Sequence, residues 1–308
     1  MAKKTKDPGL GNSSSPFAKQ IITKEGNYCV RHLNKKRKFS EAYDYLLRIS
    51  WWHFFSLSLV TYILANLIFA TLYVFIGVDE ILILENTLSF SDFLNAFFFS
   101  CQTFTSLGYG TMSPNGISSG LISSIESFLG LLFFAFVTGL LYGRFSKPRP
   151  SLRFSKDFIL REFKGKKAVM FRVVNNRVNA MIRPKVKVNL ALARQNDFGE
   201  YVNSFYDLSL QFDSITYLPT TWTVVHEIDV NSPLYEFSDE EIANQHGELL
   251  ILMSYYDEAF NQEVYQMYSY SLKEIKIGYK FVKAYYYDAE GNMTMDHDLF
   301  DTLEPHKS

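Results

Sequence analysis

The sequence predicts a two-part fold, a membrane domain of α-helices joined to an all-β sandwich of the immunoglobulin-like type. Two long apolar stretches, the first without formal charge and the second with a single acid before residue 144, predict membrane-spanning helices, which need about 20 apolar residues each. Short segments of alternating apolar and polar residues after residue 150 predict β-strands. The third observation is charge, because none of the 31 Lys and Arg lies between residues 51 and 143. A net charge of −1 over 308 residues argues against a nucleic-acid-binding protein.

Residues 1–38 are predicted to form a cytoplasmic N-terminal tail. Residues 1–17 carry lysines and a Ser-Pro run without an apolar core, so they predict a disordered segment and not a signal peptide. Residues 39–50 mix apolar and charged side chains and predict a short amphipathic slide helix in the membrane interface. The two cysteines, Cys29 and Cys101, are too few for a disulfide framework or a zinc site.

The membrane domain is predicted over residues 51–146. Residues 51–78 carry no formal charge, with their one histidine taken as neutral, and they predict the outer helix. Residues 91–105 are too short to span and predict a re-entrant pore helix. Glycines and a proline between residues 108 and 120 predict non-helical chain, which a membrane tolerates only when it is buried in protein or lines water. Residues 117–146 are long enough to form a second spanning helix, the inner helix.

Charge predicts how the membrane domain is oriented. Basic residues flank it on both sides, whereas the connection between its two spans carries acids only: Asp79, Glu80, Glu85 and Asp92. Because positively charged flanks stay inside the cell, both termini are expected to be cytoplasmic. Termini on one side require an even number of spans, which two helices and one re-entrant segment satisfy.

The re-entrant segment ends in Thr-Phe-Thr-Ser-Leu-Gly-Tyr-Gly at residues 103–110. Between two membrane helices, this run predicts a potassium selectivity filter, in which backbone carbonyls replace the water around the ion. Inward-pointing carbonyls need left-handed conformations at alternate positions, which Gly108 and Gly110 reach without cost. Leu107 and Tyr109 then point outward. The negative end of the pore-helix dipole favours a cation there.

One chain supplies only one strand of such ligands, so four chains are expected to meet around an axis as a homotetramer. The metal ions expected at this site are potassium ions at the filter carbonyls, and no cofactor is expected. The predicted potassium ligands are the backbone carbonyls of the filter residues and the side-chain hydroxyl of Ser106. The filter residues are Ser106, Leu107, Gly108, Tyr109 and Gly110. Support behind the filter is expected from Gln102, Thr103 and Thr105.

Residues 100–114 resemble the pore loop of the prokaryotic inward-rectifier potassium channels. The resemblance continues in residues 221–235 and in residues 25–28, so it covers most of the chain. In the pore loop, Ser106 stands where the family usually has Thr, and Gln102 stands where many members have Glu. The resemblance implies a potassium-selective channel with passive conduction and no enzymatic activity, located in a bacterial inner membrane.

Residues 126–148 resemble the inner helix of the same family. The resemblance implies that Tyr142 forms the gate at the cytoplasmic end. Phe134 stands where strong rectifiers place an acid, so weak rectification is expected, with Mg²⁺ or polyamines as weak blockers. Gly139 is a candidate hinge, and an aromatic stripe of this kind also suits plain helix packing. Residues four apart on one helical face are expected to line the cavity: Gly130, Phe134, Thr138 and Tyr142.

Basic residues gather on both sides of the membrane domain. Such clusters attract anionic lipids, and the family resemblance favours regulation by lipid, for example by a phosphoinositide. Ordinary positive-inside topology would produce the same cluster, so that alternative stays open. The candidate lipid ligands are Lys35, Lys36, Arg37, Lys38, Arg48, Arg144, Lys147, Arg149 and Arg153.

Residues 147–151 predict a stiff linker, and residues 152–308 predict the cytoplasmic β-sandwich. His226 and Asp229 have no nucleophile or third ligand at motif spacing, so a buried structural histidine is expected. No Gly-x-Gly-x-x-Gly follows the inner helix, which argues against a nucleotide-binding regulator. The expected strands cover residues 167–174, 185–192, 222–225, 248–255 and 279–287.

Two other functions remain open from the residues alone. The Ser106 and Gln102 departures permit a poorly selective cation channel, which the ratio of Na⁺ to K⁺ permeability would identify. A membrane-anchored β-domain that binds a partner, with a non-conducting pore, would show no flux in a folded tetramer.

Overall fold

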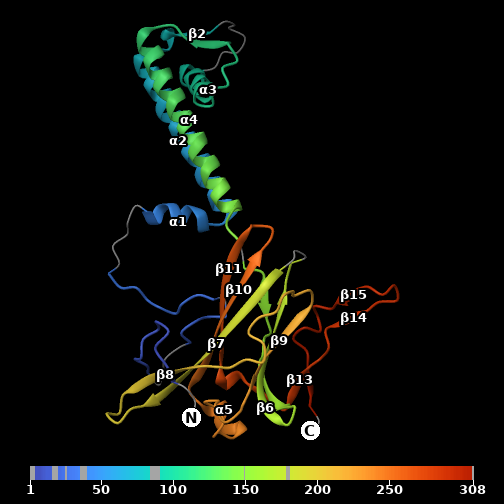
Figure 1. Cartoon of the computed structure of the whole chain (residues 1–308). Coiled ribbons are helices and arrows are strands. Elements are labelled where there is room, and N and C mark those ends of the chain that lie inside the picture. Colours follow the sequence, from blue (N-terminus) through green and yellow to red (C-terminus); the bar gives the residue numbers. More distant parts are fainter. Residues whose placement is uncertain are drawn as a thin grey trace. The chain divides into compact units, whose positions relative to one another are not determined.

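The computed structural model describes residues 4–15, 20–24, 26–34, 40–83, 91–148, 150–177 and 181–306. The chain forms two compact units, which Figure 1 draws as ribbons. The helical unit comprises residues 34–147, and the β unit comprises residues 1–33 together with residues 148–308. The first residue of the predicted slide helix and five predicted lipid ligands lie outside the described residues: Phe39, Lys35, Lys36, Arg37, Lys38 and Arg149.

In its described residues, the helical unit contains the α-helices α1 (Ser40–Arg48), α2 (Trp51–Ile76), α3 (Asp92–Phe104) and α4 (Ile117–Phe145). Helices α2 and α4 are long and apolar enough to cross a membrane. Their 26 and 29 residues, at about 1.5 Å each, exceed the ~30 Å hydrocarbon core. Ser50 begins α2, because its Oγ accepts a hydrogen bond from the backbone N–H of His53 at 3.4 Å.

The three membrane helices end slightly inside the ranges expected from the sequence, which are 51–78, 91–105 and 117–146. Helix α2 stops at Ile76 because Gly77 adopts a φ of 104°, a conformation that an α-helix does not contain. Helix α3 stops at Phe104, and the left-handed Ser106 two residues later turns the chain away.

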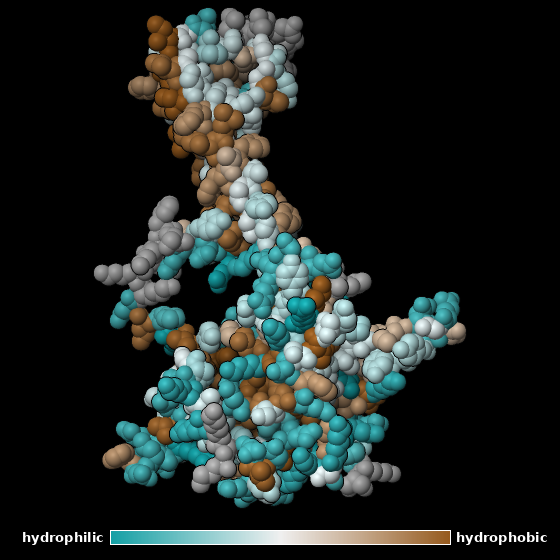
Figure 2. All heavy atoms as spheres, in the orientation of Figure 1, coloured by the Kyte–Doolittle hydropathy of each residue, from teal (hydrophilic) through white to brown (hydrophobic). Residues whose placement is uncertain are grey.

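Helices α2 and α3 approach each other closely. Ala70 of α2 and Ala96 of α3 are fully buried, and the rings of Tyr73 and Phe99 meet edge to face at 4.9 Å. Small residues allow such close approach inside a membrane. Much of the remaining surface of the long helices is apolar and exposed in the single chain, as the brown spheres of Figure 2 show. This surface suits contact with lipid or with neighbouring subunits.

The described residues of the β unit form ten strands in two main sheets, a short α-helix and two small strand pairs. The strands of the two main sheets are β1 (Lys4–Thr5), β4 (Leu152–Phe154), β5 (Ile159–Phe163), β6 (Lys166–Asn175), β7 (Met181–Gln195), β8 (Tyr201–Asp207), β9 (Thr221–Glu227), β10 (Gly247–Asp257), β11 (Gln262–Ser271) and β12 (Lys276–Ile277). The other elements are α5 (Asp239–Asn244), β13 (Tyr279–Phe281), β14 (Tyr285–Tyr287), β15 (Met293–Met295) and β16 (Leu303–Pro305).

The two main sheets enclose one hydrophobic core. One sheet has the order β1-β8-β7-β10-β11, and the other has the order β12-β5-β6-β4 with β9 paired to β6. Leu190 and Ile251 enter the core from the first sheet, and Phe171 and Trp222 enter it from the second. Side chains from both inner faces therefore fill the space between the sheets, which confirms the predicted all-β sandwich.

Residues 4–15 lie against the β unit, so the disorder predicted for residues 1–17 is wrong for this described part, and the chain continues against the same unit beyond it. Strand β1 pairs with β8, and Ile22 is buried. The carboxylate of Glu248 accepts hydrogen bonds from the backbone N–H groups of Ile21 at 2.8 Å and Ile22 at 3.3 Å. These partners lie more than 200 positions away in the sequence, so no local pattern in the N-terminal segment could predict the contacts.

The prediction of a single strand over residues 279–287 is also wrong. The segment breaks into β13, which pairs with β16, and β14, which pairs with β15. Between them, the Val282 carbonyl accepts a hydrogen bond from the guanidinium of Arg172 at 2.8 Å, and Ala284 is buried. The alternating pattern continues through the break, but tertiary contacts bend the chain there.

His226 is buried, as expected of a structural histidine. Its Nδ1 lies 2.7 Å from the carbonyl oxygen of Ser209, and its Nε2 lies 2.8 Å from Oγ of Ser232. A neutral ring that donates from Nδ1 and accepts at Nε2 satisfies both contacts. Burial lowers the pKa of His226 below its ordinary value, in agreement with a neutral ring.

Candidate functional site

The pore helix α3 ends in a left-handed cap. Ser106 has a φ of 56°, its N–H donates to the Thr103 carbonyl at 3.0 Å, and the N–H of Leu107 donates to the Gln102 carbonyl at 2.9 Å. These two bonds form the Schellman motif, which satisfies the last carbonyls of a helix. The cap therefore sets the direction in which residues 106–110 leave the pore helix.

The backbone of residues 106–110 alternates between left-handed and other conformations. Ser106, Gly108 and Gly110 have φ values of 56°, 50° and 84°, whereas Leu107 and Tyr109 do not have positive φ. Such alternation turns successive carbonyls to one side of the chain, the arrangement that replaces the water around a potassium ion. The sequence pointed to the two glycines but not to a left-handed Ser106, which continues the same alternation by one step.

The chain after this strand is tied to the connection that follows α2. Strand β2 (Ile81–Ile83) pairs antiparallel with β3 (Met112–Pro114). The Glu80 carboxylate accepts a hydrogen bond from the backbone N–H of Ser119 at 3.0 Å, in the first turn of α4. A negative group is favoured at a helix N-terminus, so Glu80 anchors the start of α4. The sequence marked Glu80 only as one of several acids in this connection.

Comparisons with known proteins match both units. A family model described as "Inward rectifier potassium channel C-terminal domain" matches residues 152–307, and one described as "Ion channel" matches residues 51–147. The inward rectifier potassium channel Kirbac3.1 of Paramagnetospirillum magnetotacticum is 32% identical over 289 residues, covering 93% of this chain and 96% of that protein.

The chain belongs to the prokaryotic inward-rectifier potassium channels. It is therefore a potassium channel and not an enzyme, as the sequence predicts. Among solved structures, the alkylpurine DNA glycosylase AlkC of Pseudomonas fluorescens bound to DNA covers 59% of this chain and 48% of that chain at 9% identity. Its TM-score of 0.19 is too low to carry any argument.

Three of the four residues expected to line the channel cavity share an exposed side of α4. Phe134 is 61% exposed and Tyr142 is 75% exposed in the single chain, and Thr138 is also exposed. Gly139, the candidate hinge, has open space around it. An exposed face on the inner helix of one subunit suits a cavity that forms between four subunits.

Gly130 departs from this expectation, because it is buried against the pore helix. A Cβ atom at Gly130 would lie 1.9 Å from the carbonyl oxygen of Phe104. The reason is helical geometry: twelve residues are three and a third turns, so Gly130 and Tyr142 differ by about 120° around the helix. Steps of four residues share a face only over a short distance.

The predicted filter supports act inside α3. The hydroxyls of Thr103 and Thr105 donate to the helix carbonyls of Phe99 and Cys101 at 2.8 Å and 2.7 Å. Oε1 of Gln102 is buried and has no hydrogen-bond partner among the described residues of the single chain. It is an acceptor in the last turn of α3 that a neighbouring subunit of the channel can satisfy.

Arg144 is held by protein groups and is only 9% exposed. Its guanidinium donates to the carbonyls of Leu46 and Ile49, both at 2.6 Å. It also lies over the rings of Trp51 and Phe54, at 4.5 Å and 4.9 Å from their centroids. The cation therefore caps the C-terminal end of α1 and ties the slide helix to the end of the inner helix. It has little freedom left to bind a lipid headgroup.

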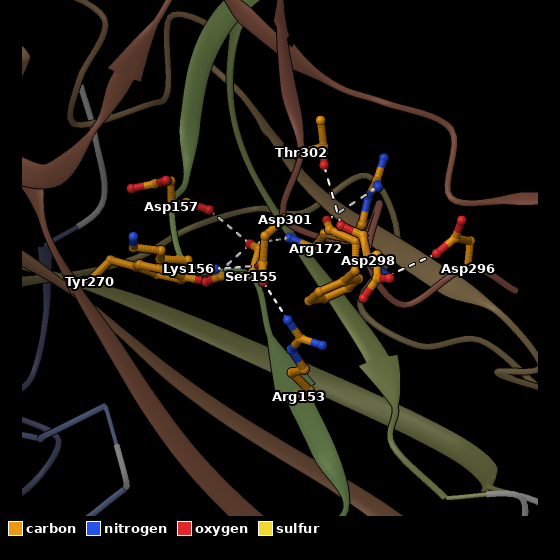
Figure 3. Close-up of polar contacts among 11 residues, drawn as sticks. Arg153, Ser155, Lys156, Asp157, Arg172, Tyr270, Asp296, Asp298, Asp301 and Thr302 are labelled. Atoms are coloured by element: carbon orange, nitrogen blue, oxygen red, sulfur yellow. Dashed lines mark hydrogen bonds and ion pairs between the residues drawn. The ribbon is translucent and has the colours of Figure 1, made fainter.

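Arg153 in the β unit also has a protein partner, as Figure 3 shows. Its Nη2 lies 2.5 Å from Oδ2 of Asp301, and the backbone N–H of Lys156 donates to the other oxygen of that carboxylate at 2.9 Å. Of the predicted lipid ligands in the described residues, Arg48 and Lys147 are the two with exposed side chains and no such partner.

Arg172 stabilises the β unit next to this ion pair, as the same view shows. It is buried, its backbone N–H donates to Oγ of Ser155 at 3.0 Å, and its guanidinium lies 4.6 Å from the centroid of Phe281. Burial lowers the pKa of Arg172 to about 10, so the side chain stays charged at neutral pH. Sequence reasoning missed this residue, because one Arg in a strand pattern carries no signal of burial.

Proposed function

We propose that four chains assemble with residues 106–110 facing a common axis, where their carbonyls and the Ser106 hydroxyl coordinate potassium ions. The observation that carries this proposal is the alternation of left-handed residues at the capped end of the pore helix. Leu107 and Tyr109 are 55% and 71% exposed in the single chain. Apolar and aromatic side chains so exposed beside a filter strand favour packing against neighbouring subunits.

Reconstitution into liposomes tests the proposal. A gradient of internal potassium drives uptake of external rubidium, with barium as blocker and sodium as the competing ion. Barium-sensitive uptake that sodium does not replace supports a selective filter. Equal sodium uptake would indicate a poorly selective cation channel, and absence of uptake even in a Tyr142→Ala tetramer would indicate a non-conducting pore.

Tyr142 forms the gate in this proposal, because its exposed ring lies three residues before the end of the inner helix. Four such rings around the axis close the cytoplasmic end of the pore. Tyr142→Ala is then expected to raise basal rubidium uptake in the same liposomes. Unchanged uptake, with wild-type tetramer content, would contradict the gate assignment.

Phe134 makes the channel a weak rectifier in this proposal. An exposed apolar side chain on α4 offers no charge to hold Mg²⁺ or a polyamine in the cavity. Phe134→Glu is expected to confer voltage-dependent block by internal Mg²⁺, with Phe134→Leu as the matched control. Equal block in both variants would show that this position does not face the ions.

Anionic lipid is the proposed modulator, bound by Arg48, Lys147 and the basic run at residues 35–38. Positive charge at the inner edge of a bacterial membrane attracts anionic headgroups, and the same charge distribution supports the proposal that both termini lie in the cytoplasm. Titration of phosphoinositide or phosphatidylglycerol into the liposomes is expected to change rubidium uptake. In the double variant Arg48→Ala/Lys147→Ala, rubidium uptake should respond less to added lipid. A response equal to that of the wild type would contradict the assignment of these two residues as lipid ligands.

A further inference from the structure

Four buried polar side chains join the three membrane helices of the helical unit. This buried cluster consists of Asn66 and Tyr73 on α2, Ser100 on α3 and Glu126 on α4, and all four side chains are 0% exposed. No Lys or Arg occurs between residues 51 and 143. Arg144 in the last turn of α4 lies 18 positions from Glu126, or about 27 Å along the helix, so it does not neutralise this carboxyl group. A carboxylate buried without a cation in a membrane is strongly disfavoured.

Three short contacts hold the buried cluster together, and each one joins two oxygen atoms. Tyr73 Oη lies 2.7 Å from Oε2 of Glu126, and Ser100 Oγ lies 2.5 Å from Oε1. Ser100 Oγ also lies 2.9 Å from Oδ1 of Asn66. Each contact needs one proton between its oxygens. The two hydroxyls supply only two protons for the three contacts.

The Asn66 amide does not supply the third proton. Its Nδ2 donates to the carbonyl oxygen of Tyr62 at 2.8 Å. Turning the amide over would bring Nδ2 to Ser100, but it would place Oδ1 against the Tyr62 carbonyl, where two acceptors would face each other. Turning the amide over would therefore leave a different contact, the one between Asn66 and Tyr62, without a proton.

The carboxyl group of Glu126 is the remaining source of a proton. When Oε1 is protonated, Glu126 donates to Ser100, Ser100 donates to Asn66, and Tyr73 donates to Oε2. All three contacts are then satisfied, and the buried cluster is neutral. The other titratable groups beside it, the Tyr62 hydroxyl and the Cys101 thiol, contact each other and are both uncharged at neutral pH.

We propose that Glu126 keeps a proton in the folded channel and that the neutral buried cluster holds the pore helix in register with the other two helices. Ser100 and Glu126 are then positioning residues for ion selectivity, because Ser100 lies on the helix whose capped end starts the filter. Ser127 supports the same helix, with its Oγ 3.4 Å from the Thr103 carbonyl oxygen. The selectivity part of this proposal rests on the proposed filter, whereas the protonation part does not.

Infrared spectroscopy of the reconstituted full-length channel tests the protonation directly. The difference spectrum between wild type and Glu126→Gln at neutral pH should contain the carbonyl stretch of a protonated carboxylic acid. That band should shift down in heavy water. A difference spectrum with carboxylate bands in its place would overturn the proposal. The band decides the protonation even in a channel that proves unselective, so the two proposals fail separately.

Rubidium and sodium uptake test the positioning role. Gln presents a donor group (NH2) and an acceptor group (C=O), as a protonated Glu does with its O–H and C=O, so Glu126→Gln should keep the rubidium-to-sodium ratio within about twofold of wild type. Glu126→Leu and Ser100→Ala should lower that ratio about tenfold, the effect of weakening one well-formed contact. Ser124→Ala is the matched control, because Ser124 is exposed on α4 and bonds only its own helix.

The Glu126 variants test whether the carboxyl is protonated, and Ser100→Ala tests the positioning role. If Glu126→Gln lowers the ratio as much as Glu126→Leu, the negative charge matters and the proposal is wrong. If Glu126→Leu forms no tetramer, Ser100→Ala still decides, because it removes a single hydroxyl. An unchanged ratio in Ser100→Ala would overturn the positioning role.

Discussion

Gly130 of the inner helix lies directly against Phe104 at the end of the pore helix, where an added Cβ would stand 1.9 Å from the carbonyl oxygen. Backbone therefore meets backbone at the point where the filter strand begins. Only glycine permits this approach without a shift of one helix. The position of the proposed filter relative to the inner helix is therefore expected to depend on Gly130.

Gly130→Ala is expected to displace the pore helix and to lower both selectivity and tetramer stability. Overpacking of this kind costs about 1–3 kcal/mol, which exceeds the ~1 kcal/mol that Ala gains over Gly in a helix. The measurements are the rubidium-to-sodium uptake ratio and the melting temperature of the tetramer. Gly139→Ala is the control, because its Cβ meets nothing within 4 Å. Equal effects of the two substitutions would contradict the prediction.

Ser106 combines a left-handed backbone with a hydroxyl, and substitution separates the two contributions. Ser106→Gly keeps the φ of 56° at no strain but removes the hydroxyl, so the tetramer should form normally. Loss of one ligand worth ~1 kcal/mol should lower rubidium uptake about fivefold. Ser106→Thr retains the hydroxyl and should conduct. Full uptake by Ser106→Gly would show that the hydroxyl is not a ligand.

Arg144→Ala should loosen the slide helix, because the carbonyls of Leu46 and Ile49 lose their cationic donor. Hydrogen bonds from a charged group contribute about 2 kcal/mol. Amide hydrogen exchange in residues 40–49 should therefore become roughly 30-fold faster. Arg144→Lys should rescue only partly, because an ammonium lacks the planar fork of the guanidinium. Arg48→Ala, at an exposed position on the same helix, should change exchange little; an equal change would point to general helix fraying.

Acid is expected to destabilise the β unit, because His226 is buried there as a neutral ring. Because burial lowers the pKa of His226 in the folded state, its full contribution to stability is present above the unfolded value of about 6.5. That contribution is lost as pH falls from there through the folded pKa. Thermal unfolding of the channel followed by circular dichroism should therefore show a melting temperature that drops below about pH 6.5.

His226→Gln is the test of this pH dependence, because Gln does not titrate. The variant should have a flatter profile over the same range, even if its melting temperature is lower throughout. Glu248 acts in the opposite direction, since burial raises the pKa of its carboxyl and its contribution declines as pH rises. The same slope in wild type and His226→Gln would assign the effect to other groups.

The sequence by itself determined the features that repeat along one element or follow from one local motif. The absence of basic residues marks the membrane region, and apolar length distinguishes the two spans from the pore helix. Gly108 and Gly110 predict the filter, because glycine reaches the left-handed backbone that this geometry needs. The alternating pattern of β7 and β10 predicts strands, and the resemblance in residues 100–114 identifies the family.

The tertiary structure decided which side of each element meets another. Asn66, Ser100 and Glu126 come together from three helices, with 34 and 26 positions between their contacts, and no local pattern records that meeting. Gly130 faces the pore helix because helical rotation carries it away from Tyr142. The choice of partner depends on packing between distant segments, so it emerges only when the whole chain has folded.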